Sequence, residues 1–412
     1  MNRSSAIIIF SKKIMLRKSI YLKTLFLMLC AFALLILSHP TESSAKDNNT
    51  VVSHNQPQEY KIIGYVAGWR QGWTSADIDA GKLTHINYAF ADIVDGRVTE
   101  LNENDTYNFQ VLDSLRIENP ALKLLISVGG WTRSTYFSDA ALTQESRYIF
   151  AKSAVDFMLR HNLDGVDLDW EYPGHPGAGN VYRKVDKQNF TLMLKELRRQ
   201  LDEQSAADNR TDNPYLLTIA TGASKGFLEN TEMHLAHQYL DFINVMTYDY
   251  HTGGSPVAGH HANLYPNQSV HFTGPSADQS IQWHIDAGIP SEKLVLGVAF
   301  YGRYWTGVRT ENNGIYQFAP GSDRGTYRFD ELRDNYINKH GFKRYWDEEA
   351  KAPFLWNAAE QKLISYDDEE SIRHKSHYIK ARGLGGAMFW EYSNNFGLEL
   401  LDALYHELIL NP

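Results

Sequence analysis

The chain has 412 residues, 43% of them hydrophobic, which is enough to bury the core of one large domain or of two ordinary ones and argues against a disordered chain. It carries 40 basic and 49 acidic residues. Residues 1–45 hold six basic residues and one acidic residue, so 34 basic and 48 acidic residues remain without them, a net charge of −14. So acidic a surface argues against nucleic acid and anionic membranes as partners, whereas a neutral or cationic polymer remains compatible.

The first 45 residues are typical of a secretory signal peptide. Basic residues precede an apolar run over 25–37, and Ser43 and Ala45 supply small residues for cleavage after Ala45. The run is shorter than the ~20 residues that cross a membrane, although an uncleaved anchor is the alternative. The only cysteine, Cys30, lies in this segment, so the mature protein would contain no disulfide. We therefore expect a secreted protein, extracellular or periplasmic, free of the membrane after cleavage, with a flexible lead-in over 46–60.

Eight apolar runs alternate with helical patterns along the rest of the chain. Near-continuous apolar runs suit parallel strands that are covered on both faces. Amphipathic patterns over 148–163 and 188–204 predict helices between them. The predicted strands are 61–67, 83–90, 122–128, 165–170, 215–221, 242–247, 294–300 and 386–391. Eight repeats of strand and helix predict an α/β fold, a (β/α)8 TIM barrel.

The connection between the seventh and eighth predicted strands is too long for this pattern. It is rich in Tyr, Trp, Phe, Gly and Asn, and it contains short alternating segments at 325–329 and 362–366. We expect a small α+β insertion domain over 304–383 that ends in a returning helix at 369–382. The barrel would then consist of 61–303 and 384–412.

Three acids occupy alternate positions at the fourth predicted strand: Asp167, Asp169 and Glu171. Side chains alternate across a strand at about 3.3 Å per residue, so the acids should form a column on one face with steps of about 6 to 7 Å. The apolar residues between them indicate a core, where burial and neighbouring carboxylates raise a carboxyl pKa. Asp164 has the opposite parity and is expected to be a supporting hydrogen-bonding residue. The alternative is a set of structural carboxylates that cap helices or pair with lysines.

The order of the acids along the strand predicts their roles, because active sites of such barrels lie at the carboxyl ends of the strands. Glu171 would be outermost and donate a proton, while Asp169 and Asp167 tune its pKa from below. Aromatic residues at other strand ends indicate a carbohydrate ligand, since their faces stack on sugar rings. Trp69 and Trp73 are further candidates for this stacking, with core packing as the alternative.

These motifs resemble glycoside hydrolase family 18, the chitinase family. Its DxxDxDxE signature is present as Asp164, Asp167, Asp169 and Glu171, followed by Tyr172 and Pro173. The segments SVGGW at 127–131, MTYD at 246–249, YGR at 301–303 and GGAMFW at 385–390 follow in the order of the family. The resemblance covers residues 60–410. It implies hydrolysis of β-1,4-linked N-acetylglucosamine polymers with retention of configuration and without a protein nucleophile.

The resemblance also implies a role for each acid. Glu171 would protonate the glycosidic oxygen while the carbonyl oxygen of the substrate's N-acetyl group attacks the anomeric carbon and forms an oxazolinium ion. Asp169 would turn from Asp167 toward Glu171 and hydrogen-bond the acetamido N–H. Tyr248 would hold the acetyl oxygen.

The substrate-binding residues are implied in the same way. Ser127 and Tyr65 resemble the partners that receive the charge left on Asp167. Asp249 and Arg303 would grip the sugar at the cleavage point. Trp390 would lie under the distorted ring, and Trp131 would hold the leaving sugar. The remaining residues predicted to bind substrate are Phe90, Gly130, Tyr172, Met246 and Tyr301.

Three other interpretations compete with this one. A metal site would combine the acids with His251, His260 and His261, but these histidines have no paired spacing with the acids and are expected to be solvated or at the rim, so we predict no metal and no cofactor. A non-catalytic chitin-binding lectin would require loss of the acid, and Glu171 is present. Endo-acting cleavage of N-glycans or peptidoglycan keeps the chemistry and changes the polymer. We expect a monomer that acts on chitin or chito-oligosaccharides.

Overall fold

The structure, a computed structural model, describes residues 59–412 except 71, 269–273 and 322. The expected signal peptide and almost all of the expected lead-in lie outside the described residues. Tyr60, at the end of that lead-in, is buried in the core. Within the described part of the chain, no helix is both long and apolar enough to cross a membrane.

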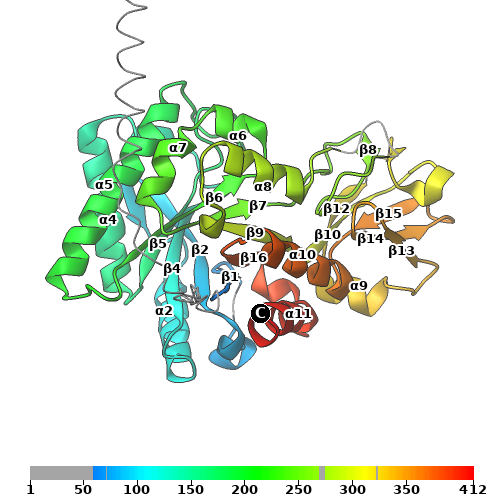
Figure 1. The fold of residues 1–412 in the computed structure, drawn as a ribbon, viewed down its shortest axis with the longest axis horizontal. Coiled ribbons are helices and arrows are strands. Elements are labelled where there is room, and N and C mark those ends of the chain that lie inside the picture. The colour runs from blue at the N-terminus through cyan, green and yellow to red at the C-terminus, as the bar shows by residue number, and fades with distance from the viewer. Residues whose placement is uncertain (1–58, 71, 269–273, 322) are drawn as a thin grey trace, which may run out of the picture. The chain divides into compact units, whose positions relative to one another are not determined.

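Eight parallel strands form a closed barrel (Figure 1), which confirms the predicted fold class. Their order is β1-β16-β9-β7-β6-β5-β4-β2, and pairing of β1 with β2 closes the ring. The strands are β1 (Lys61–Ala67), β2 (His85–Val94), β4 (Lys123–Gly129), β5 (Gly165–Asp169), β6 (Leu216–Gly222), β7 (Phe242–Met246), β9 (Leu294–Ala299) and β16 (Gly386–Trp390). Each matches one predicted strand, with differences at the ends.

The second strand differs most from its prediction. β2 continues to Val94 and pairs with a short antiparallel strand, β3 (Arg97–Thr99), that was not predicted. Asp95 and Gly96 connect the two strands, both with positive φ. An Asp-Gly pair is a strong signal for a two-residue hairpin turn, so the sequence did contain the evidence for this hairpin.

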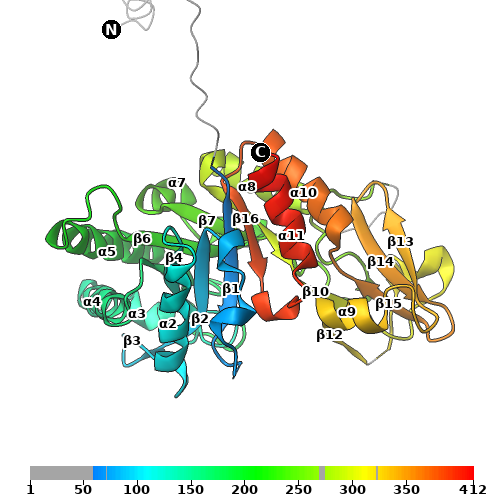
Figure 2. The same ribbon diagram turned by 90° about the horizontal axis from the view of Figure 1, so that it is seen from below.

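Helices surround the barrel (Figures 1 and 2). The two predicted helices are present with shifted ends as α4 (Gln144–Arg160) and α5 (Asp186–Ala207). α4 begins early because the side chain of Thr143 accepts a hydrogen bond from the Ser146 backbone N–H, a helix cap. The expected returning helix at 369–382 is present as α10 (Glu369–Ala381). The other helices are α2 (Asp105–Ser114), α3 (Phe137–Ala140), α6 (Lys225–Glu229), α7 (Met233–Ala236), α8 (Ala277–Asp286), α9 (Phe329–Asn335) and α11 (Glu399–Tyr405).

The barrel strands have two different faces. Val166 and Leu168 of β5 are fully buried in the large core between strands and helices, where side chains of α4 and α5 also pack. The alternate residues Asp167 and Asp169 therefore point into the barrel. A separate small cluster fills the interior and includes Ile63, Val295 and Met388. The interior is thus where the acids of β5 are placed.

The long connection after β9 forms a second sheet beside the barrel (Figure 2). Its five antiparallel strands, in the order β12-β10-β15-β14-β13, are β12 (Arg324–Arg328), β10 (Tyr301–Trp305), β15 (Lys362–Ser365), β14 (Ala352–Asn357) and β13 (Lys343–Asp347). The sheet begins at Tyr301, so Tyr301 and Arg303 belong to it and not to the barrel segment to which we assigned them. A short unpredicted pair, β8 (Val257–Ala258) with β11 (Gln317–Phe318), adds residues from the loop after β7.

Candidate active site

The three acids lie where β5 ends, but the strand is shorter than predicted. β5 stops at Asp169, and Glu171 lies in the turn beyond it. The hydroxyl of Ser134 bridges this turn, because it donates to the Asp169 carbonyl oxygen (3.1 Å) and accepts from the Glu171 backbone N–H (2.8 Å). The backbone N–H of Gly130 donates to the same carbonyl oxygen (2.8 Å). The turn therefore holds Glu171 at the mouth of the barrel, and Ser134 is a site residue that the motifs did not indicate.

Asp167 is fully buried and receives four hydrogen bonds. Tyr65 and Ser127 donate to its Oδ2, each at 2.8 Å, as the resemblance implied. Thr218 (2.6 Å) and Asn244 (3.4 Å) donate to its Oδ1 and were not predicted. Burial raises the pKa of Asp167, and the four hydrogen bonds oppose that rise by stabilising the carboxylate.

Asp169 has a different environment from Asp167. Its Oδ1 is buried without a hydrogen-bond partner among the described residues. Burial, followed by the negative charges of Glu171 and Asp167, raises the pKa of Asp169 well above its usual value. Because Asp167 has four donors, we assign the negative charge to Asp167 and the first proton to Asp169.

Glu171 is the outermost acid and contacts the cleft, with 8% of its surface exposed. Burial raises the pKa of Glu171 to about 7, a hydrogen bond with Tyr172 lowers it, and the charge of Asp249 adds to the rise. A carboxyl with this pKa carries a proton in a large fraction of molecules at neutral pH, which general acid catalysis requires.

A cleft of about 1260 Å³ lies over the acids. The predicted site residues that line it are Tyr65, Phe90, Trp131, Asp169, Glu171, Tyr172, Met246, Tyr248, Asp249, Tyr301, Arg303 and Trp390. Asp167 and Ser127 lie beneath it, fully buried. Gly130 leaves room for Phe90, which lines the cleft, because a Cβ at Gly130 would lie 2.5 Å from the Phe90 ring. An irregularity in the pairing of β2 with β4 falls at Phe90, and such bulges redirect a side chain.

Aromatic rings form a large part of the cleft surface. The Trp390 ring centre lies 5.5 Å from that of Tyr65, 5.6 Å from Phe90 and 6.1 Å from Trp69. Trp131 is 53% exposed and lies 6.4 Å from Tyr172. Of these rings, the exposed Trp69 and Trp131 and the half-buried Trp390 can stack on sugar rings, whereas Tyr65 and Phe90 are buried.

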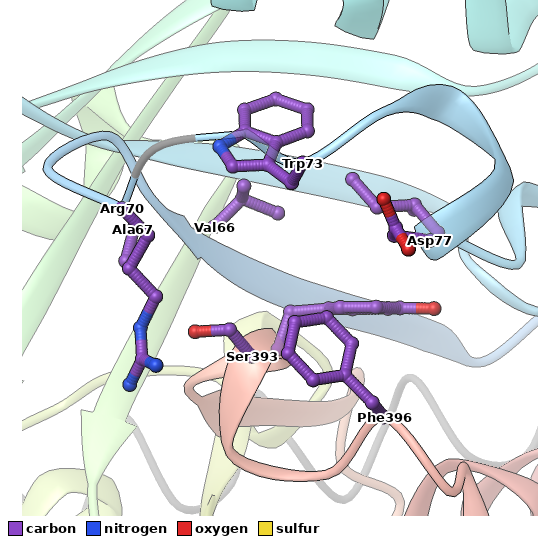
Figure 3. Close-up of a pocket in the computed structure, with 9 residues that line it drawn as sticks. Val66, Ala67, Arg70, Trp73, Asp77, Ser393 and Phe396 are labelled. Carbon is purple, nitrogen blue, oxygen red and sulfur yellow. The ribbon is translucent and has the colours of Figure 1, made fainter.

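The two further tryptophan candidates separate in the structure. Trp69 lines the cleft, whereas Trp73 lines a smaller hollow of about 340 Å³ that shares Arg70 with it. Figure 3 shows Trp73 on one side of this hollow and Ser393 and Phe396 on the other. Trp73 is 8% exposed and packs in the barrel core. Core packing is therefore the better interpretation of Trp73.

Asp249 and Arg303 form a bidentate ion pair at the edge of the cleft. Nε of Arg303 donates to Oδ1 and a terminal nitrogen to Oδ2 of Asp249, both at 2.5 Å, and the Tyr301 hydroxyl donates to Oδ1 at 2.7 Å. Burial alone would raise the pKa of Asp249, but the nearby His261 and the hydrogen bonds from Arg303 hold it well below its usual range. Tyr248, whose hydroxyl lies 3.7 Å from the Met388 sulfur, keeps its proton because burial raises its pKa.

The three histidines of the loop after β7 are buried, so their predicted place in solvent or at the rim is wrong. The loop passes under the insertion sheet through the β8–β11 pair. There, His260 contacts Asp347 (3.3 Å) and His261 faces Asp249 (3.6 Å). Over the part of the chain that the structure describes, no group of three or more His, Cys, Asp or Glu side chains is arranged to hold a metal ion.

Comparison with known proteins identifies the family. The model of Glycosyl hydrolases family 18 matches residues 61–395, so the chain belongs to this family. Chitinase A1 of Niallia circulans is 42% identical over 411 residues, which cover 85% of this chain and 58% of that protein. Chitotriosidase-1 of Mus musculus is 34% identical over 345 residues, 80% of this chain and 72% of its own. This chain therefore spans little more than half the length of Chitinase A1.

A solved structure supports the same assignment. A glycoside hydrolase family 18 N-acetylglucosaminidase from Paenibacillus barengoltzii is 45% identical, with a TM-score of 0.78. The match covers 85% of this chain and 100% of that chain. The barrel and its inserted sheet are thus shared with an enzyme of the family.

Proposed function

We propose that the protein is a secreted chitinase, which hydrolyses β-1,4-linked N-acetylglucosamine polymers with retention of configuration. The observation that carries this proposal is Glu171, a buried acid with a pKa near 7 at the mouth of an aromatic cleft, directly above two further acids. The named chitinases among the relatives support the choice of polymer. No cofactor enters the reaction, because hydrolysis needs only water and a positioned acid.

The proposed first step breaks the glycosidic bond with help from the substrate. The carbonyl oxygen of the N-acetyl group forms a bond to the anomeric carbon, and the electrons of the broken bond pass to the leaving oxygen, which takes the proton of Glu171. This leaves an oxazolinium ion and a Glu171 carboxylate. In the second step the carboxylate takes a proton from water, whose oxygen bonds to the anomeric carbon and reopens the ring. Two displacements at the same carbon retain its configuration.

The acids below Glu171 would stabilise the positive charge of this intermediate. The Oδ1 of Asp169, which is buried and has no partner among the described residues, gives the acetamido N–H an acceptor where a hydrogen bond to a developing charge is strong. Asp167 would remain the carboxylate beneath it, held by its four donors. Asp169 would turn toward Glu171 as substrate binds.

The walls of the cleft would position the sugar. Trp390 provides a ring face under the distorted sugar, and Trp131 provides one for the leaving sugar. The Asp249–Arg303 pair would hydrogen-bond sugar hydroxyls, and the Tyr248 hydroxyl would hold the acetyl oxygen. Such positioning can contribute several kcal/mol to the lowering of a barrier, on the order of 7 to 11 in the best cases.

A second candidate function is the release of single N-acetylglucosamine units from chain ends. One solved structure that is matched over its whole length, at 45% identity, is an N-acetylglucosaminidase, which favours this alternative. Endo-acting cleavage of N-glycans or peptidoglycan is the third. All three would use Glu171 as the acid. They differ in the sugar residues that are bound on either side of the cleaved bond.

The decisive experiment compares chitin oligomers, a high-mannose glycopeptide and peptidoglycan side by side. A chitinase should cleave the oligomers, with the β-anomer as the first product by NMR, and the thiazoline analogue of N-acetylglucosamine should inhibit it. Single sugars as the only early product would select the second candidate. Activity on the glycopeptide or on peptidoglycan alone would overturn the proposal.

Secretion is proposed from residues 1–45 and is tested separately. The N-terminal sequence of protein collected outside the cytoplasm should begin at Lys46 if cleavage follows Ala45. A protein that keeps its first residues and stays with the membrane would contradict the proposal.

A further inference from the structure

His261 is completely buried directly behind the cleft wall, yet it does not line the cleft. Its backbone N–H donates to Ser365 Oγ on β15 (2.9 Å), and its carbonyl oxygen accepts from the Tyr250 N–H (3.1 Å). These bonds fix its backbone between the loop after β7 and the insertion sheet. The imidazole lies against the Tyr301 ring, with centres 5.1 Å apart. The ring is therefore held in one place by both parts of the fold.

The imidazole faces an acid that lines the cleft. Its Nδ1 lies 3.6 Å from Oδ1 of Asp249, slightly beyond hydrogen-bond distance. Neither ring nitrogen has a closer partner among the described residues. A buried polar group without a partner is costly, and hydrogen bonds in empty active sites often shorten when substrate binds. Asp249 is thus the acceptor to which the Nδ1–H of His261 can donate.

The charges around His261 favour a neutral ring. Asp249 faces it from the loop after β7, Arg303 and Tyr301 from β10, and Asp367 from the segment after β15. Asp367 is itself paired with the buried ammonium of Lys375 on α10 (2.5 Å). Burial lowers the pKa of His261, and Arg303 opposes the attraction of the two aspartates. At neutral pH the ring therefore has one N–H, and the Nδ1–H tautomer directs it at Asp249.

We propose that His261 is a positioning residue for the sugar-binding pair Asp249–Arg303. Asp249 lies at the outer edge of the barrel and has a positive φ (61°). Arg303 approaches its side chain from the insertion sheet. A donor on the inner side of Oδ1 keeps the carboxylate plane aligned with the guanidinium and leaves its outer face for the substrate. This role rests on the proposed function, since the substrate of the pair is the sugar of that proposal.

The test compares three substitutions at two neighbouring histidines. His261→Asn keeps an N–H donor near the position of Nδ1, whereas His261→Leu fills the space without a donor. His260→Leu is the matched control, because His260 is equally buried, adjacent in sequence and paired with Asp347 outside the cleft. Each variant is measured for kcat and KM on a chito-oligosaccharide, for thermal stability, and for the pKa of Asp249 by ¹³C NMR.

We expect His261→Leu to raise KM about tenfold, the order expected for one hydrogen bond to a charged group, and to move the pKa of Asp249 upward. His261→Asn should restore most of both values, and His260→Leu should lower stability without changing either. Equal KM and equal Asp249 pKa in the two leucine variants would overturn the proposal, as would an asparagine variant no better than the leucine. If the wild type cleaves no N-acetylglucosamine polymer, the proposed function fails, while the NMR comparison still decides the role of His261.

Discussion

The acids of β5 and the aspartate of the Asp249–Arg303 pair carry the same carboxyl group in two contrasting environments. In the barrel, Asp169 has a buried oxygen without a partner and two acidic neighbours, which together raise its pKa. At the rim, 36% of the Asp249 side chain is exposed, and Arg303, Tyr301 and His261 surround the carboxylate, so its pKa falls. Partners, more than burial, decide whether each carboxyl holds a proton or a charge.

This contrast suggests a division of labour in the cleft. The barrel provides groups that exchange protons, and these come from one strand and the turn after it. The insertion sheet provides Tyr301 and Arg303, which hold a fixed charge at the edge. Variants that change one property and leave the other intact can therefore test the comparison.

The largest effect should come from Glu171→Gln. Glutamine keeps the size and hydrogen bonding of the side chain but has no proton of suitable acidity to give. We expect turnover of a chito-oligosaccharide to be nearly abolished while the substrate still binds, as measured by calorimetry. Turnover at the wild-type rate would show that the proton donor is another residue.

Asp169→Asn should have the next largest effect. The amide can accept a hydrogen bond, but it has no acidic proton to share with Asp167 and Glu171 as the oxazolinium ion forms. We expect kcat to fall by about 10² to 10⁴, the range for an acid-base or electrostatic residue. Asp164→Asn serves as the control, because Asp164 is an acid of the same motif whose partners Arg116 and Arg210 lie outside the cleft. A near-normal kcat for Asp169→Asn would remove Asp169 from the mechanism.

The pH dependence of the rate follows from Glu171. With a pKa of about 7 in the free enzyme, its protonated form is lost on the alkaline side, so kcat/KM should fall about tenfold per pH unit above 7. Steady-state rates between pH 5 and 9 measure this limb. A limb that lies near the usual glutamate pKa of 4.5 would show that burial does not tune this acid.

The two environments should also change stability with pH in opposite directions. The folded-state pKa of Glu171 is raised, so its contribution to the free energy of unfolding is present below about pH 4.5 and is lost as pH rises to about 7. Asp249 has a lowered pKa, so its contribution is present above its usual pKa of 3.8 and is lost in acid. Denaturant unfolding of wild type and Glu171→Gln across this range should differ in slope only between pH 4.5 and 7.

The barrel and the acid column could be predicted because their signals repeat. Eight apolar runs define eight strands, and a period of two places Asp167 and Asp169 on the inner face. The donors Thr218 and Asn244 were missed because each is a polar residue between two apolar neighbours in the sequence. Register brings Thr218 beside Asp167, and this neighbour relation is visible only once the strands are paired.

The rim was harder to predict than the barrel. The end of β5 depends on Ser134, a residue from another strand's loop, and not on the local pattern. The histidines were wrongly assigned to solvent because residues distant in sequence cover them. His260 packs against Tyr316 and Phe354, and His261 packs against Tyr301. Tertiary contacts between distant loops decide these positions, and the loop sequence alone does not contain them.

The smallest effect is expected for Trp131, which belongs neither to the acids of β5 nor to the Asp249–Arg303 pair. Trp131→Ala removes an exposed ring face, so KM for long oligomers should rise about 2- to 12-fold, equivalent to the 0.5 to 1.5 kcal/mol of one aromatic contact. Thermal stability and the alkaline limb of the rate should not change, because the side chain is 53% exposed. Tyr148→Ala, a similarly exposed aromatic on α4, is the matched control and should leave KM unaltered. A shifted pH limb in Trp131→Ala would mean that the aromatic wall helps to set the Glu171 pKa, and the separation of binding from proton transfer would then fail.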